Sequence, residues 1–426
     1  MVRELKHTEI GDIPVDWELQ TFDETFRVIS NNTLSRENLN NRGGAVRNIH
    51  YGDILTKFPE VLDCNEEEIP YVNELSLLSS STQLLQDGDI VVVDTAEDET
   101  VGKVIEVQNL GDSKLVAGLH TIPCRVKKGE FAPGWLGYYM NSDLFHNQIM
   151  PYITGIKVSS ISKGAISETL ILVPPFDEQE KIVQSLNKIQ LLMTAEIKVV
   201  NKIKLVKNGC LSKMFPQKDD TVPEMRLPGF TEAWEQRKLG ELAEIVGGGT
   251  PSTGMDSYWD GDIDWYAPAE IGEQIYLESS QRKITEEGLN KSSAKILPIG
   301  TVLFTSRAGI GKTAILLKEG CTNQGFQSIV PNKEKLDSYF IFTRSEELKE
   351  YGEKVGAGST FVEVSGKQMA NMDLMMPKTM SEQQQIGEYF QTIDHLITLH
   401  QCKCDKYSNI KKGMMSDLLT GKIRLV

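Results

Sequence analysis

The sequence predicts an α+β fold, in which two pseudo-symmetric α/β domains are separated by an antiparallel coiled coil of two long helices. Two observations predict it. A chain of 426 residues is longer than one ordinary core can serve, so we expect two or three domains. In addition, the segment 178–215 recurs at 382–419 without a gap, and both copies carry apolar residues at a seven-residue period.

The composition is that of a globular chain, with 40% apolar and 25% charged residues. No apolar run approaches the ~18–20 residues of a membrane-spanning helix, and the first residues lack the apolar core of a signal peptide. We therefore expect a cytoplasmic protein. The six cysteines are scattered and are interpreted as free thiols. Only Cys402 and Cys404 lie close together, and a zinc site needs about four ligands, so no metal is expected.

The net charge of −15 and the pI near 5.0 would, taken alone, argue against a nucleic-acid-binding protein. The charge is unevenly distributed, however. Residues 61–100 hold eleven acidic residues and no lysine or arginine, so that segment alone carries −11. The rest of the chain sums to −4, which is −15 minus −11. Basic surfaces elsewhere are therefore possible, because local patches rather than net charge decide contacts.

The first predicted domain comprises residues 1–175. Short β-type runs at 90–93 and 101–107 and a helix at 135–148 indicate a mixed core. The stretch 30–44 is rich in small and polar residues, and loops of that length usually have a function.

The first long helix is predicted at 176–216. Asp177 ahead of Glu178 suits a helix N-terminus, and the prolines just upstream do not interrupt the helix. A linker follows at 217–233, in a region where three prolines mark a boundary.

The second predicted domain comprises residues 234–377, and the second long helix with the C-terminal tail comprises 378–426. Within the domain we expect short strands, one helix and a long polar loop, at 302–305, 313–317, 327–330, 336–354 and 247–262.

The two long helices share a seam of apolar residues. Alternating steps of four and three give ten positions in each helix, of which eight are apolar. The polar exceptions fall at matching places, 196/400 and 207/411. The predicted seam residues are Ile182, Leu186, Ile189, Met193, Val200, Ile203, Ile386, Phe390, Ile393, Ile397, Cys404 and Tyr407. Two matched helices most simply pair with each other in antiparallel orientation, although two unrelated amphipathic helices on separate domains stay an alternative.

Two segments imitate enzyme motifs. Residues 306–313 nearly match a P-loop, but the first glycine is replaced by Ser306 and a strand-like run follows where a helix is required. We interpret this segment as a glycine turn between two strands. Residues 173–176 (VPPF) resemble a methyltransferase tetrapeptide, but Val173 has no group to hold a target amine. We find no catalytic constellation, so no catalytic, cofactor-binding or metal-binding residue is predicted.

Several strings, in their order along the duplicated sequence, resemble the specificity subunits of Type I restriction–modification systems. These strings are 8–17 (TEIGDIPVDW), 48–54 (NIHYGDI), 226–241 (RLPGFTEAWEQRKLGE), 249–252 (GTPS), Tyr258 with Trp259, and the proline followed by Glu-Gln that opens both long helices, with three intervening residues in the first helix and four in the second. The resemblance covers essentially the whole chain, although each string alone has low specificity.

The resemblance implies a non-catalytic subunit. Each globular part would be a target-recognition domain that reads one half of a bipartite site in double-stranded DNA. The two helices would form a spacer that docks two methyltransferase subunits, which bring S-adenosylmethionine and adenine-N6 methylation. Restriction and translocation subunits would bring ATP and Mg²⁺, so no cofactor is expected in this chain.

Lysine and arginine would contact phosphates, and polar side chains on loops would contact base edges. In the first domain the predicted DNA-binding residues are Arg36, Arg42, Arg47, Asn48, His50, Lys103, His120 and Lys157. In the second they are Thr250, Ser252, Thr253, Tyr258, Trp259, Arg307, Lys312, Gln324 and Gln327. Tyr258 and Trp259 suit a packed core equally well. An autonomous DNA methyltransferase and a coiled-coil scaffold without DNA binding stay as alternative functions.

Overall fold

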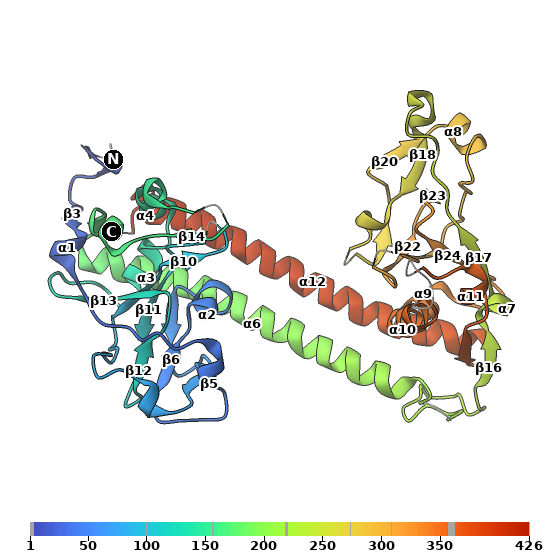
Figure 1. Cartoon of the computed structure of the whole chain (residues 1–426), viewed down its shortest axis with the longest axis horizontal. Helices are drawn as coiled ribbons and strands as arrows, with labels where there is room; N and C mark the ends of the chain where they lie inside the picture. The colour runs from blue at the N-terminus through green and yellow to red at the C-terminus, as the bar shows by residue number, and fades with distance from the viewer. Residues whose placement is uncertain are drawn as a thin grey trace. The chain divides into compact units, whose positions relative to one another are not determined.

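The computed structural model describes residues 4–98, 100–155, 157–217, 220–272, 274–307, 309–356 and 363–425. The chain divides into two compact units (Figure 1). Unit 1 comprises residues 1–196 and 402–426, and unit 2 comprises residues 197–401. Each unit therefore contains one globular part and portions of both long helices, α6 (Phe176–Met214) and α12 (Met380–Leu418).

The globular part of unit 1 is built around a five-stranded sheet. Its strand order is β4 (Phe26–Val28), β13 (Thr121–Val126), β9 (Ile90–Val93), β11 (Val104–Gln108) and β7 (Val61–Asp63). Neighbours are antiparallel except for the parallel edge pair β11 and β7. A second sheet has the order β12 (Leu115–Ala117), β6 (Arg47–Ile49), β8 (Tyr71–Val72) and β5 (Leu39–Asn40).

Shorter elements complete unit 1. Three two-stranded sheets pair β1 (Leu5–Thr8) with β2 (Gly11–Pro14), β3 (Glu18–Thr21) with β15 (Leu170–Val173), and β10 (Thr95–Ala96) with β14 (Ser159–Ser160). The helices are α1 (Phe22–Thr25), α2 (Tyr51–Thr56), α3 (Trp135–Tyr139), α4 (Asp143–Ile149) and α5 (Lys163–Ser167).

Unit 2 repeats the five-stranded sheet. Its strand order is β17 (Ala243–Gly247), β24 (Gln327–Pro331), β21 (Val302–Phe304), β22 (Thr313–Leu316) and β19 (Tyr276–Leu277). Again only the last pair is parallel. The duplication that is explicit in the helices therefore extends to the topology of the sheets.

The remaining elements of unit 2 are a three-stranded sheet, a two-stranded sheet and short helices. The sheets have the orders β20 (Arg282–Ile284), β18 (Trp259–Tyr266), β23 (Cys321–Thr322), and β16 (Glu235–Lys238), β25 (Asp373–Met376). The helices are α7 (Leu239–Leu242), α8 (Glu286–Asn290), α9 (Ser338–Thr343), α10 (Ser345–Gly356) and α11 (Gly366–Ala370).

The predicted strands form, but each predicted globular helix is divided. In unit 1, Ser142 caps a new helix, because its side chain accepts a hydrogen bond from the backbone N–H of Phe145, and this separates α3 from α4. In unit 2, Asp337 caps α9 through the N–H of Phe340, and the chain turns at Arg344 before α10. Side-chain caps therefore set these helix boundaries, which apolar periodicity alone does not reveal.

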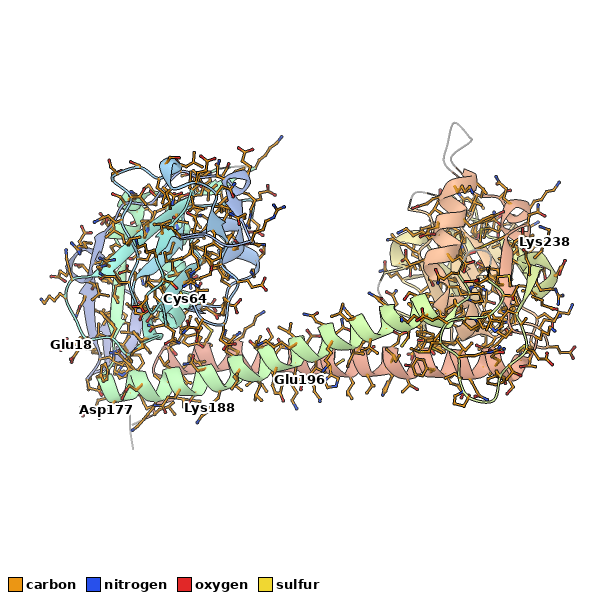
Figure 2. The ribbon with its side chains drawn as sticks, turned by 90° about the horizontal axis from the view of Figure 1, so that it is seen from below. Glu18, Cys64, Asp177, Lys188, Glu196 and Lys238 are labelled. Carbon is orange, nitrogen blue, oxygen red and sulfur yellow. The ribbon has the colours of Figure 1, made fainter. Side chains whose placement is uncertain are left out.

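Within unit 1, the first part of α6 packs antiparallel to the last part of α12. Lys411 donates a hydrogen bond to Gln190 at 2.7 Å, and Lys403 lies 3.6 Å from Glu196. Lys411 is buried and also pairs with Glu60, which lies just before β7. In Figure 2, Lys188 and Glu196 mark the course of α6.

Within unit 2, the last part of α6 packs antiparallel to the first part of α12. Lys207 pairs with the buried Asp394 at 2.6 Å, and Asp394 also accepts a hydrogen bond from Tyr339 at 2.8 Å. Cys210 lies 3.3 Å from the hydroxyl of Tyr389. The predicted pairing of α6 with α12 is therefore confirmed. Every predicted seam residue is buried or part-buried, and the matched lysines at 207 and 411 form buried polar pairs.

Each unit also anchors the start of one long helix in the same way. In unit 1, Glu178 accepts a hydrogen bond from the Trp17 indole at 2.9 Å and pairs with Arg424 from the C-terminal tail at 2.6 Å. In unit 2, the matching Glu382 accepts from the Trp234 indole at 3.1 Å and pairs with Arg226 at 2.7 Å. The C-terminal tail therefore supplies the arginine that pairs with the buried glutamate of unit 1, and the segment after α6 supplies the corresponding arginine of unit 2.

Candidate nucleic-acid interface

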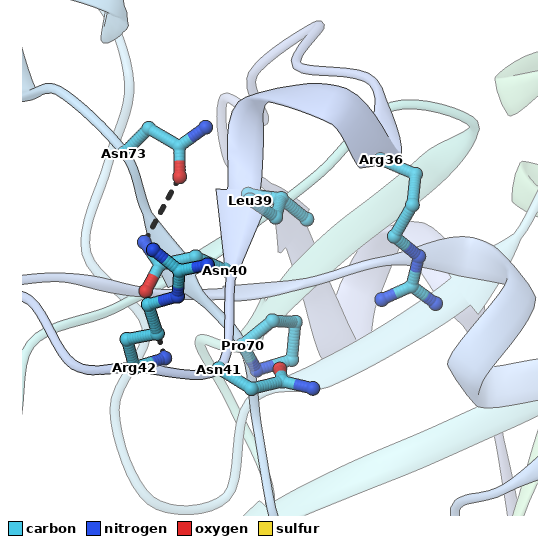
Figure 3. Close-up of a pocket in the computed structure, with 7 residues that line it drawn as sticks. All are labelled: Arg36, Leu39, Asn40, Asn41, Arg42, Pro70 and Asn73. Carbon is cyan, nitrogen blue, oxygen red and sulfur yellow. Dashed lines mark hydrogen bonds between the residues drawn. The ribbon is translucent and has the colours of Figure 1, made fainter.

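A polar pocket opens on the second sheet of unit 1 (Figure 3). Its volume is about 740 Å³. It is lined by Arg36, Leu39, Asn40, Asn41, Arg42, Pro70 and Asn73. Two of these residues, Arg36 and Arg42, were predicted to bind DNA. The lining holds two guanidinium groups and three carboxamides but no carboxylate, so it suits an anionic ligand that also presents hydrogen-bonding edges.

The three asparagines of the pocket were missed by the sequence prediction. Asn40 and Asn41 belong to the polar stretch 30–44, which was expected to be functional as a whole. Asn73 reaches the pocket only because β5 pairs antiparallel with β8, whose last residue precedes it. The asparagine content of 30–44 was the available signal for the first two, and no local signal identified Asn73.

Arg36 is held in place by an acidic partner. Its guanidinium pairs with Asp53 of α2 at 2.5 Å, while about half of the arginine side chain stays exposed. His50 caps α2 by accepting a hydrogen bond from the N–H of Gly52 at 3.1 Å. Burial, followed by the charge of Arg36, lowers the pKa of His50, so a neutral imidazole is favoured. His50 is buried and therefore has a structural role here.

Three other predicted residues of unit 1 also have structural partners. Arg47 and Asn48 belong to β6, an inner strand, and both are buried. Arg47 donates to the carbonyl of Cys64 at 2.6 Å, and Asn48 accepts from Asn32 at 2.7 Å. Lys103 donates to the carbonyls of Leu55 and Phe58, and burial lowers its pKa. These side chains hold loops together rather than forming a surface.

His120 and Lys157 complete the predicted set in unit 1. His120 has a φ of 57°, a conformation that is uncommon outside glycine, and lies 3.4 Å from Asp94. The ring of Tyr51 contacts it edge-on, with centroids 5.2 Å apart. Lys157 is exposed. His120 is partly exposed and is therefore available to a ligand, but neither residue lines the polar pocket.

In unit 2, two tryptophans hold the loop 249–252 in place. The indole of Trp265 donates to the carbonyl of Gly249 at 2.8 Å, and that of Trp259 donates to the carbonyl of Ser252 at 3.1 Å. A Cβ at Gly248 would lie 1.9 Å from the carbonyl oxygen of Asn323, so only glycine fits there. Ser252 and Thr253 are exposed on this loop.

The fixed loop brings two predicted residues together. Thr250 donates a hydrogen bond to the exposed Gln324. Gln327 starts β24 and is part-buried beside the loop glycine Gly247. Trp259 is buried, Tyr258 packs against the same small core, and Arg282 stacks 3.7 Å above the Trp259 ring. The contacts of Tyr258 and Trp259 are therefore those of residues packed in a small hydrophobic core, which was the alternative to DNA binding for these two residues.

Arg307 and Lys312 lie in the connection between β21 and β22. These strands form an antiparallel pair, as predicted, so the P-loop-like segment opens no helix and offers no phosphate cradle. Ala308, within this segment, lies outside the described residues. Lys312 is exposed and Arg307 part-exposed, at a turn with Gly309 and Gly311 in left-handed conformations.

Buried ionisable groups elsewhere have structural explanations. Burial raises the pKa of Glu106, whose carboxylate accepts from the N–H groups of Gly134 and Gly137 at the start of α3. The described residues contain no cluster of three metal-ligating side chains. No helix in the described part of the chain is long and apolar enough to cross a membrane.

Apolar side chains are also exposed along α6 and α12, away from the buried seam. Leu191 and Leu205 are 71% and 72% exposed and lie two heptads apart. Leu192, Val199 and Val206 follow each other at seven-residue spacing on the same helix. On α12, Leu396 and Ile410 occupy the positions that match Leu192 and Val206 at the offset of 204 residues. We call these residues, together with Leu399, the outer stripe.

Comparisons with known proteins agree with this architecture. A family model described as the Type I restriction modification DNA specificity domain matches residues 231–406. The putative Type I restriction enzyme MjaX specificity subunit of Methanocaldococcus jannaschii is 26% identical, over 99% of this chain and 96% of that protein. Together these matches define the chain as a DNA specificity protein.

Two solved structures share the fold. The crystal structure of the S subunit of a Type I restriction–modification system from M. genitalium has a TM-score of 0.61 at 13% identity, covering 98% of this chain and 99% of that chain. A chain from a structure of Type I complex assembly and conformational transition has a TM-score of 0.54 at 16% identity, covering 96% of this chain and 99% of that one.

The chain belongs to the specificity (S) subunits of Type I restriction–modification systems. In this family the S subunit is the non-catalytic component of the complex and typically binds no cofactor itself. This assignment replaces the two alternatives, an autonomous methyltransferase and a scaffold without a DNA function.

Proposed function

We propose that this S subunit reads a bipartite target in double-stranded DNA, with one half-site contacted by each unit and an unread gap between the halves. The observation that supports the proposal is the duplication. Both units share the strand order and pairing pattern of a five-stranded sheet, and each exposes polar loop residues. Two related modules in one chain imply two related, separate recognition sites on the duplex.

In the first unit the proposed contacts come from Arg36, Arg42, His120 and Lys157, which are at least partly exposed. In the second unit they come from the loop 249–252 with Thr253, from Gln324 and Gln327, and from Arg307 and Lys312. Guanidinium and ammonium groups would contact phosphates, and the hydroxyl and carboxamide groups would contact base edges.

The paired helices serve as the spacer in this proposal. Each has 39 residues, which corresponds to about 58 Å at 1.5 Å per residue. A shift of one helix along the other would separate Lys207 from Asp394 and Lys411 from Gln190, and it would leave buried polar groups without partners. The register is therefore defined, and the helix length would set the unread gap.

The outer stripe is the proposed docking surface for two methyltransferase subunits. Exposed apolar residues at a period of seven suit a partner helix packed alongside, since such contacts repeat every two turns. Matching stripe residues on α6 and α12 suit two copies of one partner. The partners would supply S-adenosylmethionine and adenine-N6 methylation, and restriction subunits would supply ATP- and Mg²⁺-dependent cleavage in the cytoplasm.

Methylome sequencing of host DNA, with the gene present and deleted, tests the proposal. We expect adenine methylation at one split motif with a fixed gap, and its loss on deletion. The purified complex should bind that motif with a strong dependence on salt. Methylation that persists after deletion, or a continuous motif without a gap, would contradict the proposal. Tight S-adenosylmethionine binding by the isolated chain would contradict the part of the proposal that assigns this cofactor to the methyltransferase subunits.

A further inference from the structure

The polar pocket of unit 1 contains two kinds of carboxamide: those that are hydrogen-bonded within the protein and one that is exposed. Asn40 and Asn73 are bonded to each other and to the backbone, whereas Asn41 is exposed. Among the described residues, the side chain of Asn41 makes no hydrogen bond. The same holds for the guanidinium of Arg42. A side chain can bind a ligand only if its polar groups are not already engaged within the protein. Asn41 and Arg42 meet this condition, whereas Asn40 and Asn73 do not.

Asn40 shapes the turn that presents the free groups. Its Oδ1 accepts hydrogen bonds from the backbone N–H of Arg42 at 2.9 Å and of Gly43 at 3.2 Å, which is an asparagine-capped turn. Gly43 has a φ of 127°, which few side chains tolerate. A Cβ at Gly44 would lie 2.9 Å from the Cβ of Tyr71, so the end of the turn lies close to β8.

Asn73 braces the same turn from the neighbouring strand. Its Oδ1 accepts from Asn40 Nδ2 at 2.9 Å, the dashed contact of Figure 3, and its Nδ2 donates to the carbonyl of Glu37 at 3.0 Å. Both ends of this carboxamide are therefore engaged. Asn40 and Asn73 are positioning residues, because they act on a ligand only through the turn that they hold.

The surroundings of Asn41 match the edge of a base pair. Arg36 and Arg42 line the pocket on either side of it in the view of Figure 3, and Leu39 and Pro70 contribute apolar surface. A free asparagine carboxamide pairs with adenine by accepting from N6 and donating to N7 in the major groove, and apolar surface suits the thymine methyl. The arginines, one of them oriented by Asp53, suit the flanking phosphates.

Resting on the function proposed above, we propose that the turn 40–43 is a base-reading element for the first half-site and that Asn41 reads an adenine in it. Asn41 is then a specificity-determining residue. Asn40 and Asn73 define its position, and Arg42 contributes affinity without sequence preference. The ligand is one A·T pair of double-stranded DNA, contacted from the major groove.

The test compares five variants of the full chain, at Asn41, Asn65 and Asn73, each co-expressed with the methyltransferase subunits in a host without background methylation. Asn41→Ala removes the carboxamide, and Asn41→Asp keeps its shape but removes the donor. Asn65→Ala is the matched control, because Asn65 is another exposed asparagine of unit 1 whose side chain makes no hydrogen bond among the described residues, and it lies in the acidic segment 61–100. The motif methylated by each variant is determined by methylome sequencing.

We expect both Asn41 variants to relax one adenine-specified position of one half-motif. Discrimination in a competition binding assay should fall by about tenfold or more, while the other half-motif and the gap stay unchanged. Asn65→Ala should retain the wild-type motif. Asn73→Ala should relax the same position as Asn41→Ala, and Asn73→Gln should not restore it, since a longer side chain displaces the turn.

Two outcomes would overturn the inference. One is an unchanged motif in both Asn41 variants. The other is loss of complex assembly with an unchanged motif in the residual complex, which would make the turn a protein contact. If the wild-type chain directs no split-motif methylation, the proposed function itself fails, which is a distinguishable result. Circular dichroism and the melting temperature of each variant confirm that the chain is folded.

Discussion

Replacing Arg424 by methionine should destabilise unit 1 while leaving unit 2 unchanged. Arg424 makes two hydrogen bonds to Glu178, at 2.6 and 2.7 Å, and two to Asp16, at 2.9 and 2.6 Å. The side chain of Glu178 is only 1% exposed. Methionine keeps most of the apolar volume but removes the cation, so a buried carboxylate loses its charged partner.

The magnitude follows from the burial of Glu178. Removing one partner of a buried ion pair typically costs about 3–5 kcal/mol. Trp17 and the backbone N–H of Leu425 still donate to Glu178, so we expect the lower end of that range, about 3 kcal/mol. For a unit of this size each 1 kcal/mol lowers the melting temperature by roughly 2–4 °C, so the expected fall is about 6–12 °C.

Hydrogen exchange followed by mass spectrometry assigns the effect to a unit. Faster exchange is expected in peptides from the start of α6 and from the C-terminal tail, and unchanged exchange in unit 2. Arg226→Met is the matched variant, because Arg226 pairs with Glu382 in the same way, and it should show the reverse pattern. Equal melting temperatures and equal exchange for Arg424→Met and wild type would refute the reasoning.

The pH dependence of this effect provides an internal check. The hydrogen bond to Arg424 lowers the pKa of Asp16 below its ordinary value. A carboxyl whose pKa is lower in the folded state stabilises the fold above its unfolded pKa, about 3.9, and loses that contribution as the pH falls through the folded value. The difference in stability between wild type and Arg424→Met should therefore narrow below about pH 4.

Three further predictions concern the helices, the pocket and a turn. The double variant Leu191→Gln/Leu205→Gln should weaken co-purification of the methyltransferase subunits by tenfold or more without lowering the melting temperature, whereas Lys204→Gln should retain binding; equal recovery of partner in all samples would contradict the docking proposal. Arg42→Ala should weaken DNA binding uniformly across sequences and reduce the salt slope by about 1, and a changed motif would show that Arg42 reads a base. Gly311→Ala should lower stability by about 1–3 kcal/mol more than Gly309→Ala in thermal unfolding, because both glycines have positive φ but only at Gly311 would a Cβ lie 2.3 Å from Lys349 Cγ.

The candidate site contains residues of the same type that differ in burial because of their place in the fold. Arg36, Arg42 and Arg47 are equivalent in type and lie within twelve positions of each other in the sequence. Arg47 is buried because β6 lies between β12 and β8, whereas Arg42 is exposed because it follows β5, at the edge of the same sheet. The order of strands in a sheet depends on segments that are distant in the sequence. Residue type alone therefore predicted all three arginines to bind DNA and could not separate the buried one from the exposed ones. Asn73 joins the pocket for the same reason, through a strand pair that no local pattern indicates.

The long helices, by contrast, were predictable from the sequence. Their apolar period is local, it continues for about five heptads, and it occurs twice, so the sequence by itself determined the helices, their seam and the duplication of the chain. Tertiary structure alone decided what pairs with the polar positions in the seam. Lys411 contacts Glu60, which lies 351 positions away, and Lys207 contacts Asp394. Periodicity is set by the geometry of one helix, whereas the partner of a buried charge depends on which distant segment folds against it.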